Sequence, residues 1–127
     1  MPPLRLLTVI GARPQIIKAA AISRAVKSRG NEIAELLLHT GQHYDANMSQ
    51  VFFDELGVPR ADVSLGVGSG AHGVQTARMI EGVEQALAQH KPDVVLLYGD
   101  TNSTLAGAVA ASKLHIPVAH VEAGLRS

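Results

Sequence analysis

Five short apolar runs, separated by longer segments of helical periodicity, constrain the fold of this chain more than any other feature. The runs cover residues 4–10, 32–39, 61–65, 94–98 and 116–121. The first and fourth are apolar along most of their length, as strands buried on both faces of a parallel sheet are. Strands that alternate with helices predict an α/β fold: a doubly wound, Rossmann-like parallel sheet with helices on both faces.

Signals for helix boundaries lie between these runs. Pro14 suits the first turn of a helix that Gly30 ends. A short second helix is predicted through residues 45–56, and a longer one ends at His90. Small residues fill the helical segment 103–114 before the fifth run. The alternation of strand and helix therefore continues along the whole sequence.

Composition excludes several classes of protein. The 127 residues, 46% of them hydrophobic, suffice for one domain that buries about two-thirds of its unfolded surface. The formal net charge is zero and no basic run is interleaved with aromatic residues, so no nucleic-acid partner is predicted. There is no cysteine, which excludes disulfides and thiolate metal sites. The first apolar run is too short for a signal peptide or a membrane span, so we expect a cytoplasmic protein without membrane contact.

Two acidic residues follow the fourth and fifth apolar runs. Asp100 comes two residues after Tyr98, and Glu122 comes directly after Val121. A right-handed crossover brings two such strands close together with their carboxyl ends on one edge of the sheet. Ligands of open α/β sheets bind along that edge, and two converging carboxylates suit proton transfer at carbon. We therefore predict an acid–base pair; the structural alternative for Asp100 is a helix cap.

Polar residues near these acids give further candidates for the site. The turn after the first run places Arg13 and a helix N-terminus at the same edge, which suits an anion such as phosphate. A surface arginine beside a turn glycine is the alternative. Thr101 and Asn102 begin a helix, and they either cap it or reach substrate hydroxyls. Arg126 can pair with Glu122 or with a ligand phosphate.

The sequence predicts neither a cofactor nor a metal. Residues 66–71 match the letters of the G-x-G-x-x-[GA] dinucleotide fingerprint, but they follow the third run, and no acidic residue closes the next strand at the required distance. His39 and His43 are four residues apart across a strand end and a loop, so the helical spacing of metal ligands does not apply. His120, inside the fifth run, is expected to be a hydrogen-bonded core histidine.

Four blocks of residues resemble the non-hydrolysing UDP-N-acetylglucosamine 2-epimerases of bacteria and archaea. They are residues 11–14 with Lys18, 40–43, 99–104 and 120–127. The resemblance runs over essentially the whole chain and implies the glycosyltransferase-B arrangement, in which two Rossmann-like domains face each other across a cleft. Residues 1–127 would form most of the N-terminal catalytic domain. The C-terminal domain, which in the family holds much of the UDP, would be absent.

The resemblance implies conversion of UDP-N-acetylglucosamine to UDP-N-acetylmannosamine at C2. The substrate loses its C2 proton and UDP to give a glycal, UDP adds back, and the proton returns on the other face. Asp100 and Glu122 match carboxylates that the family requires for catalysis. Arg13 matches an arginine beside the diphosphate, and Lys18 matches a basic residue in the same region.

Partners and regulation are also implied by the resemblance. Gln42 and His43 match a Gln-His pair that some members use at a second, regulatory nucleotide-sugar site, although residues 44–49 differ from the loop of those members. The implied partners are a UDP-sugar substrate and, for the full-length protein, a second copy in a homodimer. No cofactor is implied.

Departures from the family pattern leave other functions open. Many members read G-T-R-P-E where this chain has Ala12 and Gln15. The sequence Gly-Ala-Arg-Pro-Gln, with Asp-Ala-Asn-Met-Ser at 45–49, is closer to a branch that epimerises UDP-2,3-diacetamido-2,3-dideoxyglucuronate, the alternative substrate. A non-catalytic UDP-sugar-binding domain is the alternative from another class. The chain ends soon after the fifth run, so we expect the isolated fragment to be inactive.

Overall fold

The computed structural model describes the chain except for residues 1, 12, 42–60, 68–69 and 122–127. Its strands form one parallel sheet in the order β3-β2-β1-β4-β5. The strands are β1 (Leu4–Ile10), β2 (Ile33–His39), β3 (Val63–Ser64), β4 (Val94–Tyr98) and β5 (Val118–Val121). The described helices are α1 (Arg13–Ser28), α3 (His72–His90) and α4 (Asn102–Lys113).

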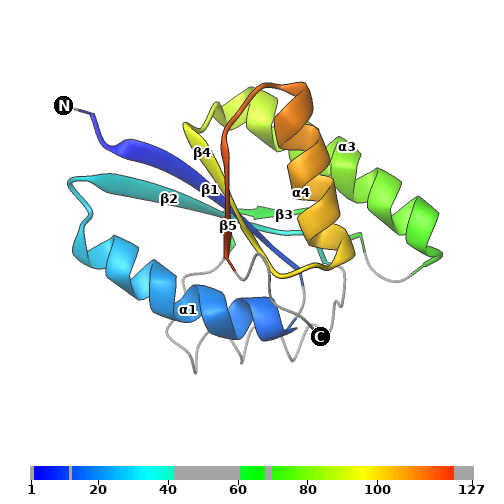
Figure 1. Cartoon of the computed structure of the whole chain (residues 1–127), viewed down its shortest axis with the longest axis horizontal. Coiled ribbons are helices and arrows are strands. Elements are labelled where there is room, and N and C mark those ends of the chain that lie inside the picture. The colour runs from blue at the N-terminus through cyan, green and yellow to red at the C-terminus, as the bar shows by residue number, and fades with distance from the viewer. Residues whose placement is uncertain (1, 12, 42–60, 68–69, 122–127) are drawn as a thin grey trace.

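Helices cover both faces of the sheet. Helix α1 lies on one face, whereas α3 and α4 pack against each other on the opposite face (Figure 1). The predicted α/β fold with a doubly wound parallel sheet is therefore confirmed. The short helix predicted through residues 45–56 falls outside the described residues.

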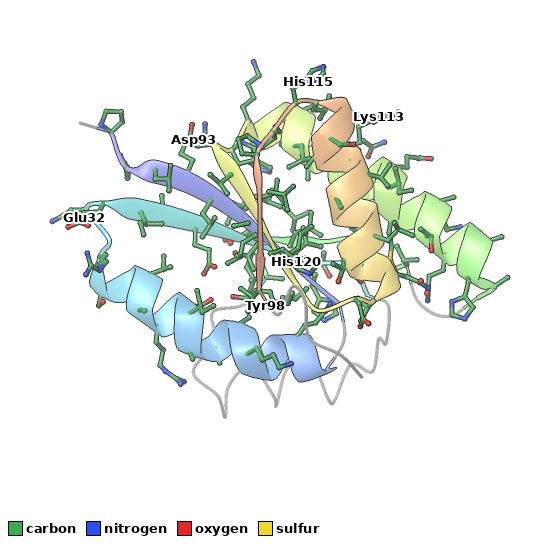
Figure 2. The ribbon with its side chains drawn as sticks, viewed as in Figure 1. Glu32, Asp93, Tyr98, Lys113, His115 and His120 are labelled. Atoms are coloured by element: carbon green, nitrogen blue, oxygen red, sulfur yellow. The ribbon has the colours of Figure 1, made fainter. Side chains whose placement is uncertain are left out.

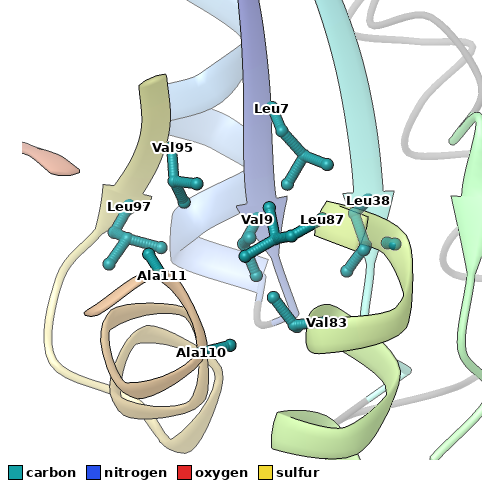
Figure 3. Packing of buried hydrophobic residues seen from close by; sticks show 10 residues of the cluster. Leu7, Val9, Leu38, Val83, Leu87, Val95, Leu97, Ala110 and Ala111 are labelled. Carbon is teal, nitrogen blue, oxygen red and sulfur yellow. The ribbon is translucent and has the colours of Figure 1, made fainter. Parts of the chain in front are cut away.

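The core divides into two clusters because alternate residues of a strand point to opposite faces. On the α1 side, Leu6 and Ile10 of β1 pack with Ala19, Ala20 and Val26 of the helix. On the other side, residues of the sheet pack against residues of α3 and α4 (Figure 3). The sheet contributes Leu7, Val9, Leu38, Val95 and Leu97, and the helices contribute Val83, Leu87, Ala110 and Ala111. Full burial of each Leu or Val side chain stabilises the fold by about 1.5–3 kcal/mol.

Small residues let α4 approach β4 closely. A Cβ atom added at Gly107 would come closer than 3.0 Å to the side chain of Leu97. Ala106, Ala110 and Ala111 on the same helix are fully buried. The small residues of segment 103–114 are thus explained by the close packing of α4 on the sheet. This packing keeps the start of α4 next to the end of β4.

The fifth strand begins two residues later than predicted. Residues 114–117 are used to leave α4: the N–H of Ile116 donates to Ala111 O, and His115 adopts a left-handed backbone with φ 58°. Pro117 has no N–H to donate to the sheet. Regular pairing therefore starts at Val118, which lies opposite Val95.

The order of the strands reverses beside β1. The chain runs outward through β2 and β3, then returns through α3 to place β4 on the other side of β1. The carboxyl ends of β1 and β4 therefore border a topological switch point, where open α/β sheets bind their ligands. Any site of this domain is expected at the turns that follow these two strands.

Candidate functional site

Asp100 lies in the turn that follows β4, at the predicted edge of the sheet. Tyr98 ends the strand, and Gly99 then adopts φ 68°, a left-handed conformation that favours glycine. Asp100 follows with an exposed side chain. In the described part of the chain, no hydrogen bond or ion pair engages its carboxylate. The turn therefore presents this carboxylate outward at the carboxyl edge.

The cap of α4 is Thr101 rather than Asp100. The Thr101 hydroxyl accepts a hydrogen bond from the N–H of Thr104 at 3.4 Å, and the Thr104 hydroxyl accepts one from the N–H of Thr101 at 3.2 Å. This reciprocal pair is a capping box. The alternative reading of Asp100 as the helix cap is therefore wrong, and the cap role predicted for one of the polar residues belongs to Thr101.

The side chain of Asn102 joins the starts of α4 and α3. Its Nδ2 lies 2.9 Å from Nδ1 of His72 and donates to Oε1 of Gln75 at 2.9 Å. Gln75 is buried and His72 is exposed. Because these partners belong to another element, Asn102 has a structural role in this chain beside any contact with a substrate.

A buried glutamine bridges the two turns at the switch point. Gln15, which is 3% exposed, accepts a hydrogen bond from the N–H of Gly11 at 2.8 Å. Its Nε2 donates to the carbonyl of Tyr98 at 2.7 Å and to the hydroxyl of Thr101 at 2.8 Å. One side chain of α1 therefore connects the turn after β1 with the turn after β4. The sequence reading noted Gln15 only as a departure from a family pattern.

Two buried hydroxyl groups form a hydrogen bond on the interior side of these turns. The hydroxyls of Thr40, after β2, and Ser103, in the first turn of α4, lie 2.9 Å apart in a hydrogen bond. Gly11 packs against both, because a Cβ atom at this position would come closer than 3.0 Å to either oxygen. The turns after β1, β2 and β4 are thus joined below the edge that carries Asp100.

Burial shifts the pKa of two groups near this edge. Nδ1 of His39, at the end of β2, accepts a hydrogen bond from the N–H of Gly41, and burial lowers the pKa of His39. Burial, followed by the negative charge of Glu35, raises the pKa of Tyr98. The Tyr98 hydroxyl has no hydrogen-bond partner among the described residues. His39 is accordingly neutral near pH 7, and its acceptor nitrogen holds the start of the following loop.

His120 supports the turn of Asp100 from the neighbouring strand. It lies on β5 beside the end of β4, where Figure 2 labels both His120 and Tyr98. Its Nε2 is hydrogen-bonded to the carbonyl of Gly99, whose N–H donates to Val121 O at 3.1 Å. The expectation of a core histidine is wrong in burial but correct in hydrogen bonding, since His120 is exposed on a strand that pairs with β4 on one side only.

An apolar groove of about 410 Å³ lies beside the same turn, between α4 and β5. Gly99, Asp100, Thr101 and His120 border it at the carboxyl edge. Apart from Thr104, its remaining wall is apolar and comes from the helix and the two strands: Leu97, Leu105, Ala108 and Val118. The groove therefore places the Asp100 carboxylate at the border between an apolar surface and solvent.

Several predicted site residues fall outside the described part of the chain. These are Gln42, His43, Glu122 and Arg126. Arg13 begins α1 at the switch point, but its side chain is likewise not described. Lys18 is exposed on α1. Tyr98 pairs with Val121 in the sheet, and Glu122 is the next residue in the sequence. The convergence of Asp100 and Glu122 stays a prediction.

The described residues contain no group of three or more His, Cys, Asp or Glu side chains that could hold a metal ion. None of the helices they form is both long enough and apolar enough to span a bilayer.

Comparison with known proteins gives consistent matches. A family model described as UDP-N-acetylglucosamine 2-epimerase matches residues 24–127. The chain is 55% identical over 124 residues to the UDP-2,3-diacetamido-2,3-dideoxy-D-glucuronate 2-epimerase of Pseudomonas aeruginosa. The matched region covers 98% of this chain and 35% of that protein. It is 50% identical over 124 residues to the UDP-N-acetylglucosamine 2-epimerase of Methanocaldococcus jannaschii, across 33% of that protein.

Solved structures match the fold over the same residues. The M. jannaschii UDP-GlcNAc 2-epimerase in complex with UDP-GlcNAc and UDP superimposes with a TM-score of 0.91, covering 98% of this chain and 34% of that one. The Neisseria meningitidis enzyme bound to UDP-GlcNAc gives a TM-score of 0.88 at 33% identity, covering 98% and 33%. The chain thus spans about a third of the length of the relatives it matches.

Proposed function

This chain belongs to the UDP-N-acetylglucosamine 2-epimerase family, and from that premise we propose that its protein interconverts UDP-N-acetylglucosamine and UDP-N-acetylmannosamine. The described sheet would be the N-terminal half of a two-domain glycosyltransferase-B fold. The family resemblance supports a cytoplasmic homodimer as the working form. The exposed carboxylate of Asp100 on a fixed turn at the switch point is the observation that carries the proposal.

The proposed reaction proceeds by elimination and re-addition. A carboxylate takes the C2 proton while the C1–O bond to UDP breaks, which leaves a glycal with a C1=C2 double bond. UDP then re-forms the C1–O bond, and a proton is delivered to C2 from the opposite face. We assign Asp100 and Glu122 to the two proton transfers, without dividing the roles between them.

Basic residues would stabilise the leaving diphosphate. Arg13 begins α1 at the switch point, where helix N–H groups and a guanidinium suit an anion. Lys18 lies five residues further along α1, and Arg126 is close to Glu122 in the sequence. We propose that these cations offset the charge that develops on UDP as the C1–O bond breaks.

Solvent deuterium tests the reaction directly. When the full-length protein epimerises its substrate in D₂O, the product should carry deuterium at C2, because the abstracted proton exchanges with solvent before re-addition. Epimerisation without deuterium at C2 would contradict the elimination mechanism. A protein that binds UDP-sugars but exchanges nothing at C2 would instead be the non-catalytic binding domain.

Carboxamide variants test the two acids. Asp100→Asn and Glu122→Gln should lower turnover by at least roughly a hundredfold, the loss expected when an acid or base is removed. Asp100 is exposed, so its variant should change the free energy of unfolding by less than about 1 kcal/mol. Asp93→Asn is the matched control: Asp93 precedes β4 at the opposite end of the strand, where it accepts from the N–H of Arg5. Normal turnover in Asp100→Asn would return Asp100 to a surface role.

A second substrate deserves the same assay. The relative at 55% identity is named for UDP-2,3-diacetamido-2,3-dideoxy-D-glucuronate, against 50% for the M. jannaschii enzyme named for UDP-N-acetylglucosamine. Measuring kcat/KM for both sugars on one preparation decides between them. A ratio above about tenfold, equivalent to about 1.4 kcal/mol in transition-state binding, would identify the preferred substrate.

A further inference from the structure

We infer that Gln15 is a positioning residue that fixes the turn carrying Asp100 for proton transfer. The inference rests on the proposed function, because the turn matters for catalysis only if Asp100 is an acid or base. It concerns a residue that does not itself face the substrate edge, since Gln15 is buried in the first turn of α1. Its contribution would therefore pass entirely through the backbone and hydroxyl groups that it holds.

The side-chain amide of Gln15 forms hydrogen bonds with the chain on both sides of Asp100. Its Nε2 donates to the carbonyl of Tyr98 at 2.7 Å, two residues before Asp100, and to the hydroxyl of Thr101 at 2.8 Å, one residue after it. The hydroxyl oxygen of Thr104 is a third acceptor, 3.2 Å from the same nitrogen. An amide nitrogen carries only two hydrogens, so its donor capacity is fully used. The Thr104 hydroxyl adds a bond to the same Tyr98 carbonyl at 2.6 Å.

The other end of the amide is bonded to the turn directly after β1. Oε1 of Gln15 accepts from the N–H of Gly11 at 2.8 Å. Gly11 cannot shift toward the sheet interior, because it already packs against the hydroxyls of Thr40 and Ser103. The turn after β4 is therefore hydrogen-bonded through one buried side chain to the turn after the central strand β1, in addition to its own helix cap.

A purely structural role makes a different prediction. Buried hydrogen bonds of this kind contribute to stability wherever they lie, and Ser23 offers a comparison on the same helix. Ser23 is 2% exposed and donates to Oε1 of Glu35 at 2.7 Å, away from the Asp100 turn. If Gln15 acts only on stability, its loss and the loss of the Ser23 hydroxyl should affect catalysis alike. If it positions Asp100, only the Gln15 variant should lower kcat.

The decisive variant is Gln15→Met, which keeps the length of the side chain but neither donates nor accepts these bonds. In the full-length protein, well below the unfolding temperature, we expect kcat to fall at least about tenfold, because small misplacements of a catalytic group are costly. KM should change less than about threefold. Ser23→Ala should leave both constants within about twofold. Gln15→Glu, which can accept from the N–H of Gly11 and from the Thr101 hydroxyl but cannot donate to the Tyr98 carbonyl, should recover only part of the lost kcat.

Amide hydrogen exchange separates this inference from the proposed function. In Gln15→Met, exchange across residues 99–104 should quicken, and it should stay unchanged in Ser23→Ala. Wild-type kcat in Gln15→Met, or equal losses of kcat in both variants, would overturn the positioning role while leaving the epimerase proposal intact. An inactive wild-type protein would reject the proposed function. Unchanged amide exchange across residues 99–104 in Gln15→Met would reject the claim that Gln15 fixes the turn.

Discussion

Replacing Gly11 by alanine should destabilise the domain more than any exposed substitution at the candidate site. The added Cβ would come closer than 3.0 Å to the hydroxyl oxygens of Thr40 and Ser103, a separation that real Cβ atoms essentially never show. Both side chains are buried and short, so neither can swing away without losing their mutual hydrogen bond of 2.9 Å. Overpacking costs about 1–3 kcal/mol, and a lost buried hydrogen bond adds about 1 kcal/mol.

The expected loss for Gly11→Ala is therefore about 2–4 kcal/mol in the free energy of unfolding. Urea unfolding followed by circular dichroism measures it. Gly73→Ala is the matched control, because Gly73 lies exposed in the first turn of α3 with no atom within 4 Å of an added Cβ. Alanine there should raise stability by up to about 1 kcal/mol. A loss below about 0.5 kcal/mol in Gly11→Ala would refute the close packing of the three turns.

Two further substitutions test buried polar groups. Tyr98→Phe removes a hydroxyl that has no partner among the described residues, so the free energy of unfolding should stay constant or rise by up to about 1 kcal/mol; a clear loss would reveal a partner. Burial lowers the pKa of His39 in the folded state. The unfolded chain therefore binds the proton more tightly, and wild-type stability should fall as pH drops below about 6.5. His39→Asn keeps an acceptor for Gly41 and should show a smaller decline between pH 7 and pH 5.

Much of the fold was predictable because the apolar runs are sharply bounded. The bounds of β1 and β4 follow the sequence prediction residue for residue, since turn-forming residues flank each run. The bounds of β3 and β5 were predicted too long. The late start of β5 depends on how residues 114–117 leave α4, as the left-handed His115 shows. Such geometry is set by tertiary packing that a periodic pattern does not report.

The candidate site was predictable only in part, for a related reason. The place of Asp100 follows from one strand end, so the local sequence suffices. The partners of Gln15 and Thr40 do not: Thr101 is 86 residues from Gln15, and Ser103 is 63 residues from Thr40. A polar residue in the first turn of a helix is ordinarily exposed. Only the strand order, which places β4 beside β1, makes these residues neighbours.

The backbone and the side chain of Asp100 should contribute separately to stability and to activity, which can be measured. The backbone around Asp100 is held from three elements, by Gln15 of α1, His120 of β5 and the capping box of α4. The carboxylate itself is exposed. Substituting Asp100 should therefore remove activity with little change in stability. Substituting Gly11 should lower stability, because the added side chain would displace the buried hydroxyls of Thr40 and Ser103. Because the two effects act on different groups, a double variant should show additive losses in unfolding free energy. Strong coupling between them would mean that the Asp100 side chain, and not only its backbone, belongs to the packed structure.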